Sequence, residues 1–209
     1  MEMNNINGKT NRKTMYECRV QDRCAFRYYV GLIIRWGNNL KYGFSRFVAR
    51  RKGAFIGRYV IIPWQLARKA NKNLRIGDHS LIQTNLIDLR NKVTIGSNVI
   101  IGSETEIITT SHNIDSVDFE HKNYGIEIED YVWICVKVIV LPSCRKIGTG
   151  AVISSGSVVV KDVQSMSVMS GNPAVEIRKR KLVHSDLIVE SLLGGDYKMY
   201  KQMRKELKR

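Results

Sequence analysis

The sequence is poor in cysteine, proline and acidic residues. Its 209 residues include 4 Cys, 3 Pro and 19 Asp or Glu, against 34 Lys or Arg. The four cysteines form no Cys-x-x-Cys pair and do not cluster with histidines at the spacing of zinc ligands. We therefore expect four free thiols and no metal site, which excludes a disulfide-stapled secreted scaffold. The cysteines are Cys18, Cys24, Cys135 and Cys144.

Targeting segments and long apolar runs are also lacking. The N-terminal stretch MEMNNINGKTNRK has no apolar region of the kind found in a secretory signal. The apolar patches YVGLII and VWICVKVIV are much shorter than the roughly 20 residues that span a bilayer. The length suits one domain with terminal appendages. These features predict a cytoplasmic protein.

The net charge of +15 is concentrated at the two ends. Residues 1–52 hold twelve Lys or Arg against three acids, and residues 176–209 hold ten against five. Basic ends can meet nucleic acid, anionic lipid or a phosphorylated cofactor, and charge alone does not choose among these. Residues 15–52 mix aromatics with Arg, which predicts one or two basic amphipathic helices and allows peripheral attachment at the inner face of a membrane.

The centre of the chain repeats with a period of six. Aliphatic residues recur at Ile95, Ile101 and Ile107, and a small or β-branched residue stands four places after most of them. A helix needs apolar spacings of three and four, and a sandwich needs strict alternation, so neither fits. The same register occurs at Ile56, Ile62, Ile76, Ile82, Ile128, Ile134, Val140, Ile147, Ile153 and Val159.

A six-residue period predicts a solenoid of short parallel strands. Three hexapeptides make one triangular coil of about 18 residues, which buries the aliphatic column inside. Gly follows the aliphatic residue at several coil corners, where we expect its permissive backbone to be needed. The solenoid is predicted for residues 54–174, between a basic, helical segment at 1–53 and a helical or partly disordered basic tail at 175–209. Residues 109–127 lack the aliphatic column and form an extended loop, a frequent place for functional residues.

Four segments resemble the hexapeptide-repeat acetyltransferases, particularly the branch that O-acetylates bacterial surface polysaccharides and includes the colanic-acid acetyltransferases. They are also similar to the galactoside and maltose acetyltransferases. The resemblance implies an all-β fold, a left-handed parallel β-helix that departs from the usual right-handed crossover. It also implies a homotrimer with active sites between subunits, and acetyl-CoA as co-substrate without a metal. The segments are TTSHNID, IEIEDYVWI, VLPSCRKIGTGAVISSGSVVVKDV and SGNPAVEIRKR.

The resemblance also implies roles for individual residues. His112, in the extended loop, is the general base that takes the proton of a sugar hydroxyl as its oxygen attacks the thioester. Asn113 and Asp115 orient the imidazole or hold the acceptor, and Asn85 and Asp88 loosely match the acceptor region. The acceptor is expected to belong to a capsule, exopolysaccharide or O-antigen, and its identity stays open.

Four further positions match the coenzyme A site of the family. Trp133 matches an aromatic beside the channel, Ser155 lies where backbone groups meet the pantetheine arm, and Lys161 and Arg178 match cations that bind phosphates. The sequence departs from the family pattern where Gly, Thr or Lys is usual, which puts the strength of coenzyme A binding in doubt. These departures are Cys135, Ser143, Ser154, Val160 and Val175.

Other functions remain open at this point. N-acetylation of an amino sugar or of an antibiotic-like acceptor uses the same scaffold. A zinc-dependent hydratase of the γ carbonic anhydrase type needs three histidine ligands, and His79, His112 and His121 lack a convincing register. A non-catalytic scaffold or nucleic-acid binder would use the basic ends and would bind no coenzyme A. Acetyl transfer is favoured, so no nucleic-acid partner is expected.

Overall fold

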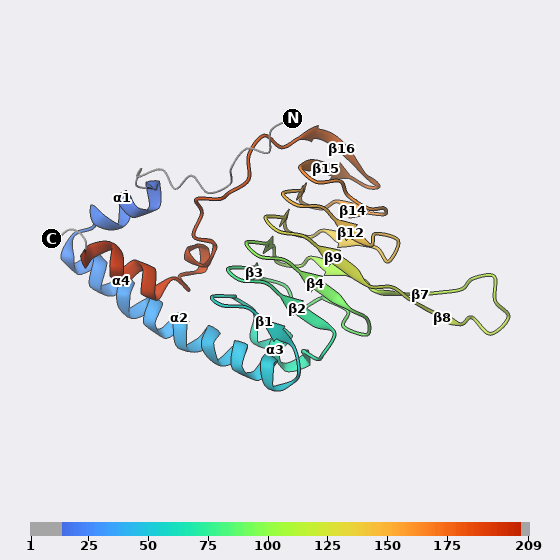
Figure 1. Ribbon diagram of the computed structural model, residues 1–209, viewed down its shortest axis with the longest axis horizontal. Helices are drawn as coiled ribbons and strands as arrows, with labels where there is room; N and C mark the ends of the chain where they lie inside the picture. The colour runs from blue at the N-terminus through green and yellow to red at the C-terminus, as the bar shows by residue number, and fades with distance from the viewer. Residues whose placement is uncertain (1–13, 206–209) are drawn as a thin grey trace, which may run out of the picture.

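The computed structural model describes residues 14–205. Parts of the predicted N-terminal segment and C-terminal tail, residues 1–13 and 206–209, lie outside this range. The described chain is mostly β and contains three parallel sheets (Figure 1).

The first sheet contains β1 (Phe55–Ile56), β2 (Leu74–Ile76), β4 (Val93–Ile95), β9 (Ile126–Ile128) and β12 (Lys146–Ile147). The second contains β3 (Leu81–Ile82), β5 (Ile100–Ile101), β10 (Trp133–Ile134), β13 (Val152–Ile153), β15 (Ser167–Gly171) and the antiparallel β16 (Ala174–Lys179). The third contains β6 (Glu106–Ile107), β11 (Ile139–Val140) and β14 (Val158–Val159).

The chain visits the three sheets in a fixed order. Strands β4, β5 and β6 lie in the first, second and third sheets, and β9, β10 and β11 repeat that order, as do β12, β13 and β14. We refer to one such passage as a coil. Parallel pairing places Ile95 beside Ile128 and Ile101 beside Ile134 in successive coils. Residues one coil apart are therefore neighbours in space.

The aliphatic column predicted by the six-residue period forms the core between the three sheets. Ile95, Ile101 and Ile107 are buried, as are their equivalents in the neighbouring coils. Burial of one such side chain contributes roughly 1.5–3 kcal/mol. The small position four residues later is also buried, and where it is polar it bonds to the next coil: the Thr105 hydroxyl donates to the carbonyl of Cys135 at 2.8 Å. The column and its small partner together fix the spacing of the coils.

Glycine at the coil corners is needed for close packing rather than for an unusual backbone. A Cβ at Gly96 would lie 2.8 Å from the backbone nitrogen of Asp130 in the next coil, and a Cβ at Gly77 would lie 2.7 Å from the backbone nitrogen of Ser97. Left-handed φ values occur instead two residues further on, at non-glycine residues such as Asn98 (φ 56°). The expectation of a permissive backbone at these glycines is therefore wrong.

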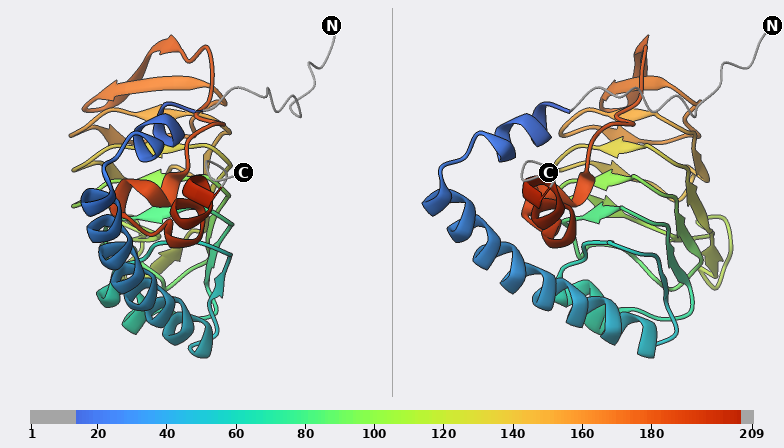
Figure 2. Two further views of the ribbon diagram at one scale, coloured as in Figure 1. Left: turned by 90° about the vertical axis from the view of Figure 1, so that its left-hand side faces the viewer. Right: turned by 60° about the vertical axis from the view of Figure 1, so that its left-hand side comes forward.

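Helices cover one side of the sheets (Figure 2). They are α1 (Met15–Gln21), α2 (Ala25–Arg51), α3 (Trp64–Lys69), the 3-10 helix η1 (Val189–Leu193) and α4 (Tyr197–Lys205). Helix α1 begins with a capping box between Thr14 and Glu17, and its Val20 packs with Tyr28 of α2 and Tyr200 of α4. The C-terminal end of the chain is thus held against its N-terminal helices. No helix within residues 14–205 has the length and apolar character that crossing a bilayer requires.

The strands continue past residue 174, where the predicted solenoid ends and the predicted tail follows from residue 175. The chain reverses at Gly171, whose φ of 104° favours glycine, and β16 pairs with β15. The pairing satisfies the backbone groups of a segment that is otherwise exposed, and η1 and α4 follow.

The predicted loop 109–127 contains a β-hairpin. Strands β7 (Thr110–His112) and β8 (His121–Asn123) pair antiparallel, with Thr110 opposite Asn123 and His112 opposite His121. This arm projects from the sheets on the side away from α2 (Figure 1).

Candidate active site

His112 is the last residue of β7 and lies half-buried on the arm. Its Nδ1 atom is 2.8 Å from the backbone carbonyl of Phe119. A carbonyl oxygen can only accept a hydrogen bond, so Nδ1 carries the proton in the neutral ring. Nε2 is then unprotonated and can accept a proton from a ligand.

Two rings hold this imidazole in place. The Phe119 ring stacks on it with centroids 4.3 Å apart and planes 13° apart, and the ring of His121 lies 4.2 Å away at a tilt of 44°. Phe119 has a φ of 52°, which turns the backbone so that its carbonyl and its ring both face His112. The sequence did not predict either contact, because the antiparallel register of the hairpin brings these rings together and no local sequence motif indicates that register.

Asp88 lies at the root of the arm. Its carboxylate accepts hydrogen bonds from the Thr110 hydroxyl at 3.0 Å and from Arg90 Nε at 2.9 Å. Burial acts to raise the pKa of this carboxyl, but the hydrogen bonds from Arg90, Thr109 and Thr110 outweigh it and hold the pKa well below its ordinary value. Asp88 is therefore ionised and engaged with the arm, which leaves the arm root fixed to the coil beneath.

The other acceptor candidates occupy different places. The Asn113 amide donates to Glu120 Oε1 at 2.9 Å and so braces the hairpin, while Asp115 is exposed near the arm tip. Asn85 is exposed in the segment that follows β3. Among the described residues, no hydrogen bond joins the imidazole of His112 to any of these three side chains, and the Phe119 carbonyl orients it instead.

The coenzyme A candidates lie on the sheets and not on the arm. Trp133 is exposed on β10, and Ser155 follows β13 in a turn beside Cys135. Lys161 follows β14 and is exposed, as is Arg178 on β16. Within the part of the chain that the structure describes, no bond or ring contact joins His112 to any of the four. In one copy of the chain, the candidates on the arm and the coenzyme A candidates are thus not in contact.

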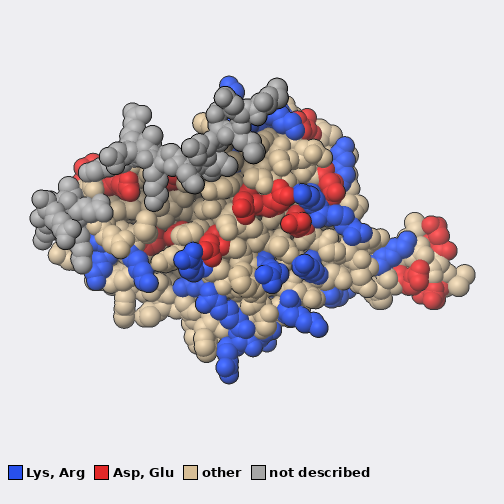
Figure 3. Space-filling model, in the orientation of Figure 1, with Lys and Arg blue, Asp and Glu red and all other residues tan. Residues whose placement is uncertain are grey.

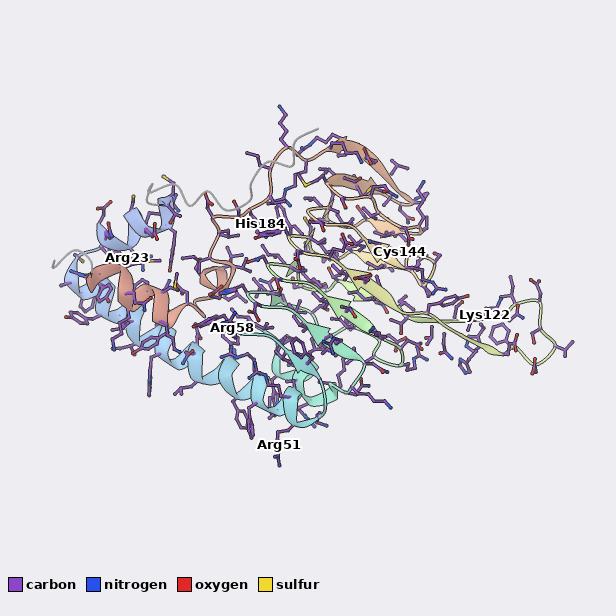
Figure 4. All side chains as sticks on the ribbon, viewed as in Figure 1. Arg23, Arg51, Arg58, Lys122, Cys144 and His184 are labelled. Carbon is purple, nitrogen blue, oxygen red and sulfur yellow. The ribbon has the colours of Figure 1, made fainter. Side chains whose placement is uncertain are left out.

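The remaining histidines and cysteines do not form a competing site. His79 contacts Glu190 with its Nδ1 atom at 3.1 Å and lies on a coil, so it does not converge with the arm histidines. Among residues 14–205, no group of three His, Cys, Asp or Glu side chains is placed to hold a metal ion. Cys144 is buried at a coil corner (Figure 4), and burial raises the pKa of its thiol to about 12.

Charge is unevenly distributed over the surface. Acidic residues gather at the arm tip, whereas Lys and Arg dominate the lower face in the same view (Figure 3). The tip acids are Asp115, Asp118 and Glu120.

Comparisons with known proteins place the chain in a family. No family model matches it. The Escherichia coli protein named "Putative colanic acid biosynthesis acetyltransferase WcaF" is 32% identical over 150 residues, which cover 71% of this chain and 81% of that protein. The chain belongs to the hexapeptide-repeat acetyltransferases. A second relative, a Schizosaccharomyces pombe "Putative acetyltransferase", is 43% identical over 93 residues, which span 42% of this chain and 43% of the yeast protein.

A solved structure agrees with this family assignment. A hexapeptide-repeat-containing acetyltransferase of Vibrio cholerae, solved in complex with acetyl-CoA, has a TM-score of 0.59 and 26% identity to this chain. The match covers 80% of this chain and 100% of that one. The predicted resemblance to the hexapeptide-repeat acetyltransferases is confirmed, and the chain is an acetyltransferase.

Proposed function

We propose that the protein transfers the acetyl group of acetyl-CoA to a saccharide hydroxyl during the biosynthesis of a surface polysaccharide. The observation that carries the proposal is the hydrogen bond from His112 Nδ1 to the Phe119 carbonyl, because it leaves Nε2 free to act as a base. The relative in colanic acid biosynthesis supports the class of acceptor. A capsule, an exopolysaccharide or an O-antigen is the expected product.

The proposed reaction is direct. His112 Nε2 takes the proton of the acceptor hydroxyl while the oxygen attacks the thioester carbonyl. The carbon–sulfur bond then breaks, and the protonated imidazole returns the proton to the sulfur of coenzyme A. The products are an acetyl ester and free coenzyme A, so no nucleophile on the enzyme is required.

The proposal extends to the handedness of the coils and to the assembly. We infer that the coils wind left-handed as a parallel β-helix, and that three copies form a homotrimer. An arm that projects from the sheets needs a second copy to bring His112 to residues such as Trp133 and Ser155. The acidic arm tip suits a chain whose net charge is +15.

Coenzyme A would lie between the arm of one copy and the coils of another. Trp133 offers an aromatic face beside the pantetheine, and the turn at Ser155 offers backbone groups. Lys161 and Arg178 are exposed cations that can meet the phosphates. Asn85 and Asp115 remain candidates for the acceptor.

The decisive assay follows release of coenzyme A from acetyl-CoA with a panel of sugars and amino sugars. We expect release only with hydroxyl acceptors, and a loss of at least about 100-fold in His112→Ala, with acetyl-CoA binding retained in calorimetry. The control is His184→Gln, because both nitrogens of His184 already bond within the fold. Release with amino groups alone would indicate N-acetylation, and absence of coenzyme A binding would indicate a scaffold.

A further inference from the structure

Helix α2 presents polar residues to the rest of the protein. On its inward face, Arg35 bonds to Asp196 at 2.8 Å and Asn38 donates to the carbonyl of Leu193. Further along the same face, Arg46 donates to the carbonyl of Val60. The fully buried residues of the helix are mostly small, namely Gly31, Ser45 and Ala49, with Tyr28 near the start. The face that packs on the protein is therefore mixed, with polar residues beside a few apolar ones such as Leu32 and Tyr42.

Most of the large apolar side chains of α2 point outward instead. Spacings of three and four residues place them on one side of the helix, and each is at least 40% exposed. Phe44 stacks on Trp64 of α3 but remains 58% exposed. We refer to this surface as the apolar stripe: Phe26, Tyr29, Val30, Ile33, Ile34, Trp36, Leu40, Phe44 and Phe47.

The stripe continues into a hollow between α2 and α4. The hollow has a volume of about 260 Å³ and is lined by Leu32, Ile33, Trp36 and Tyr197. It opens beside the stripe and is walled by apolar or aromatic side chains. A stripe of this size exceeds the scattered apolar residues normal on a soluble surface and indicates a binding surface.

The charge around the stripe is of one sign. Residues 23–77 contain 13 Lys or Arg and no Asp or Glu. Arg27, Lys41 and Arg51 lie on α2 itself, and the lower face in Figure 3 is correspondingly basic. A second copy that met this surface face to face would bring like charges together, which costs free energy. An anionic partner with an apolar interior removes that conflict.

We propose that α2 binds the surface of an anionic phospholipid bilayer, with the apolar stripe among the acyl chains and its Lys and Arg at the headgroups. Apolar and aromatic residues on one face with flanking cations are typical of helices that lie in a bilayer interface. The 27 residues of α2 give a contact line about 40 Å long. The arm is on the other side of the sheets, so bilayer contact leaves His112 in water (Figure 1).

Vesicle sedimentation with the full chain tests this proposal. We expect binding to vesicles of phosphatidylcholine with phosphatidylglycerol, and much weaker binding to phosphatidylcholine alone. Ile33→Gln combined with Leu40→Gln, at side chains 68% and 53% exposed, should lower the partition coefficient at least about tenfold. The matched control, Ile177→Gln with Leu182→Gln, changes side chains 58% and 81% exposed on the strand β16 and the segment after it, and should bind as the wild type does.

Three results would overturn the proposal. The first is absence of vesicle binding, and the second is an equal loss of vesicle binding in the two double variants. The third is a smaller oligomer by light scattering in the Ile33/Leu40 variant, which would assign the stripe to a second copy. Thermal unfolding of both variants checks that the fold is intact. The readout is independent of acetyl transfer, so failure of the proposed reaction leaves it unaffected.

Discussion

The carboxylate of Asp88 accepts a hydrogen bond of 3.0 Å from the hydroxyl of Thr110, two residues before His112. Asp88 belongs to the coil beneath, whereas Thr110 begins the arm. The bond therefore ties the direction of the arm to the rigid sheets. Residues that act through such a contact position the reacting group without touching the substrate.

This relationship separates Asp88 from Asn85, which were both predicted in the acceptor region. We expect Asp88→Ala to lower kcat about tenfold with little change in acceptor KM, because a loosened arm misplaces His112. Asn85→Ala is the comparison, since Asn85 is exposed and should change acceptor KM alone. Steady-state kinetics with saturating acetyl-CoA measures both. A rise in acceptor KM with unchanged kcat in Asp88→Ala would indicate instead that Asp88 binds the acceptor.

The ion pair between Arg35 and Asp196 should contribute strongly to stability. Asp196 has a fully buried side chain and Arg35 is 12% exposed, and Tyr16 also donates to the carboxylate. Asp196→Asn leaves a buried guanidinium without its counter-charge, which costs about 3–5 kcal/mol. Chemical denaturation measures the change.

Glu104→Gln is the control for that variant. Its pair with Lys137 is 3.8 Å long and 67% exposed on both sides, so the free energy of unfolding should change by less than about 1 kcal/mol. Similar changes in the two variants would mean that burial of the Arg35 pair is unimportant.

The surroundings of His184 predict that the folded protein loses stability in mild acid. Arg180 donates to its Nδ1 and Nε2 donates to the carbonyl of Asn98, which suits a neutral ring. Burial lowers the pKa of His184, the Asn98 carbonyl opposes this, and the charge of Arg180 adds to it. The unfolded chain therefore binds a proton at a higher pH than the folded chain. The free energy of unfolding falls as the pH drops from about 6.5 toward the lowered pKa.

The variant His184→Gln tests that pH dependence. A glutamine amide can accept from Arg180 and donate to Asn98 without titrating. We expect the difference in Tm between pH 7.5 and pH 5.5 to be smaller in the variant than in the wild type. An identical difference in both proteins would assign the acid sensitivity to another group.

The sequence predicted the part of the fold that depends on burial. The six-residue period at Ile95, Ile101 and Ile107 marks side chains that the coils bury, so the pattern and the structure share one physical cause. The hairpin pairing that brings His121 to His112 produces no such pattern in the sequence, because an exposed arm needs no apolar periodicity. His112 itself was predicted as a site residue through family motifs, and its partner Phe119 binds it through a backbone carbonyl that any residue possesses.

The orientation of α2 could not be predicted from the sequence, for a related reason. An amphipathic pattern shows that a helix has two faces, but not which face meets the protein. Ion pairs with distant residues decide this: Arg35 bonds to Asp196, which lies 161 positions away. Only the folded chain displays that pair.

Substitutions at the coil-corner glycines distinguish the effect of close packing from that of backbone freedom. An added Cβ at Gly96 would meet the backbone of Asp130 at 2.8 Å, and parallel pairing of the coils prevents that backbone from moving away. Gly96→Ala should therefore lower the free energy of unfolding by about 1–3 kcal/mol. Gly37→Ala is the matched control, because no heavy atom lies within 4 Å of its added Cβ on α2. The same substitution should there raise stability by about 0.5–1 kcal/mol, since Ala favours a helix over Gly. A neutral Gly96→Ala would mean that the coils can separate at this corner, and that their spacing is set by the aliphatic column alone.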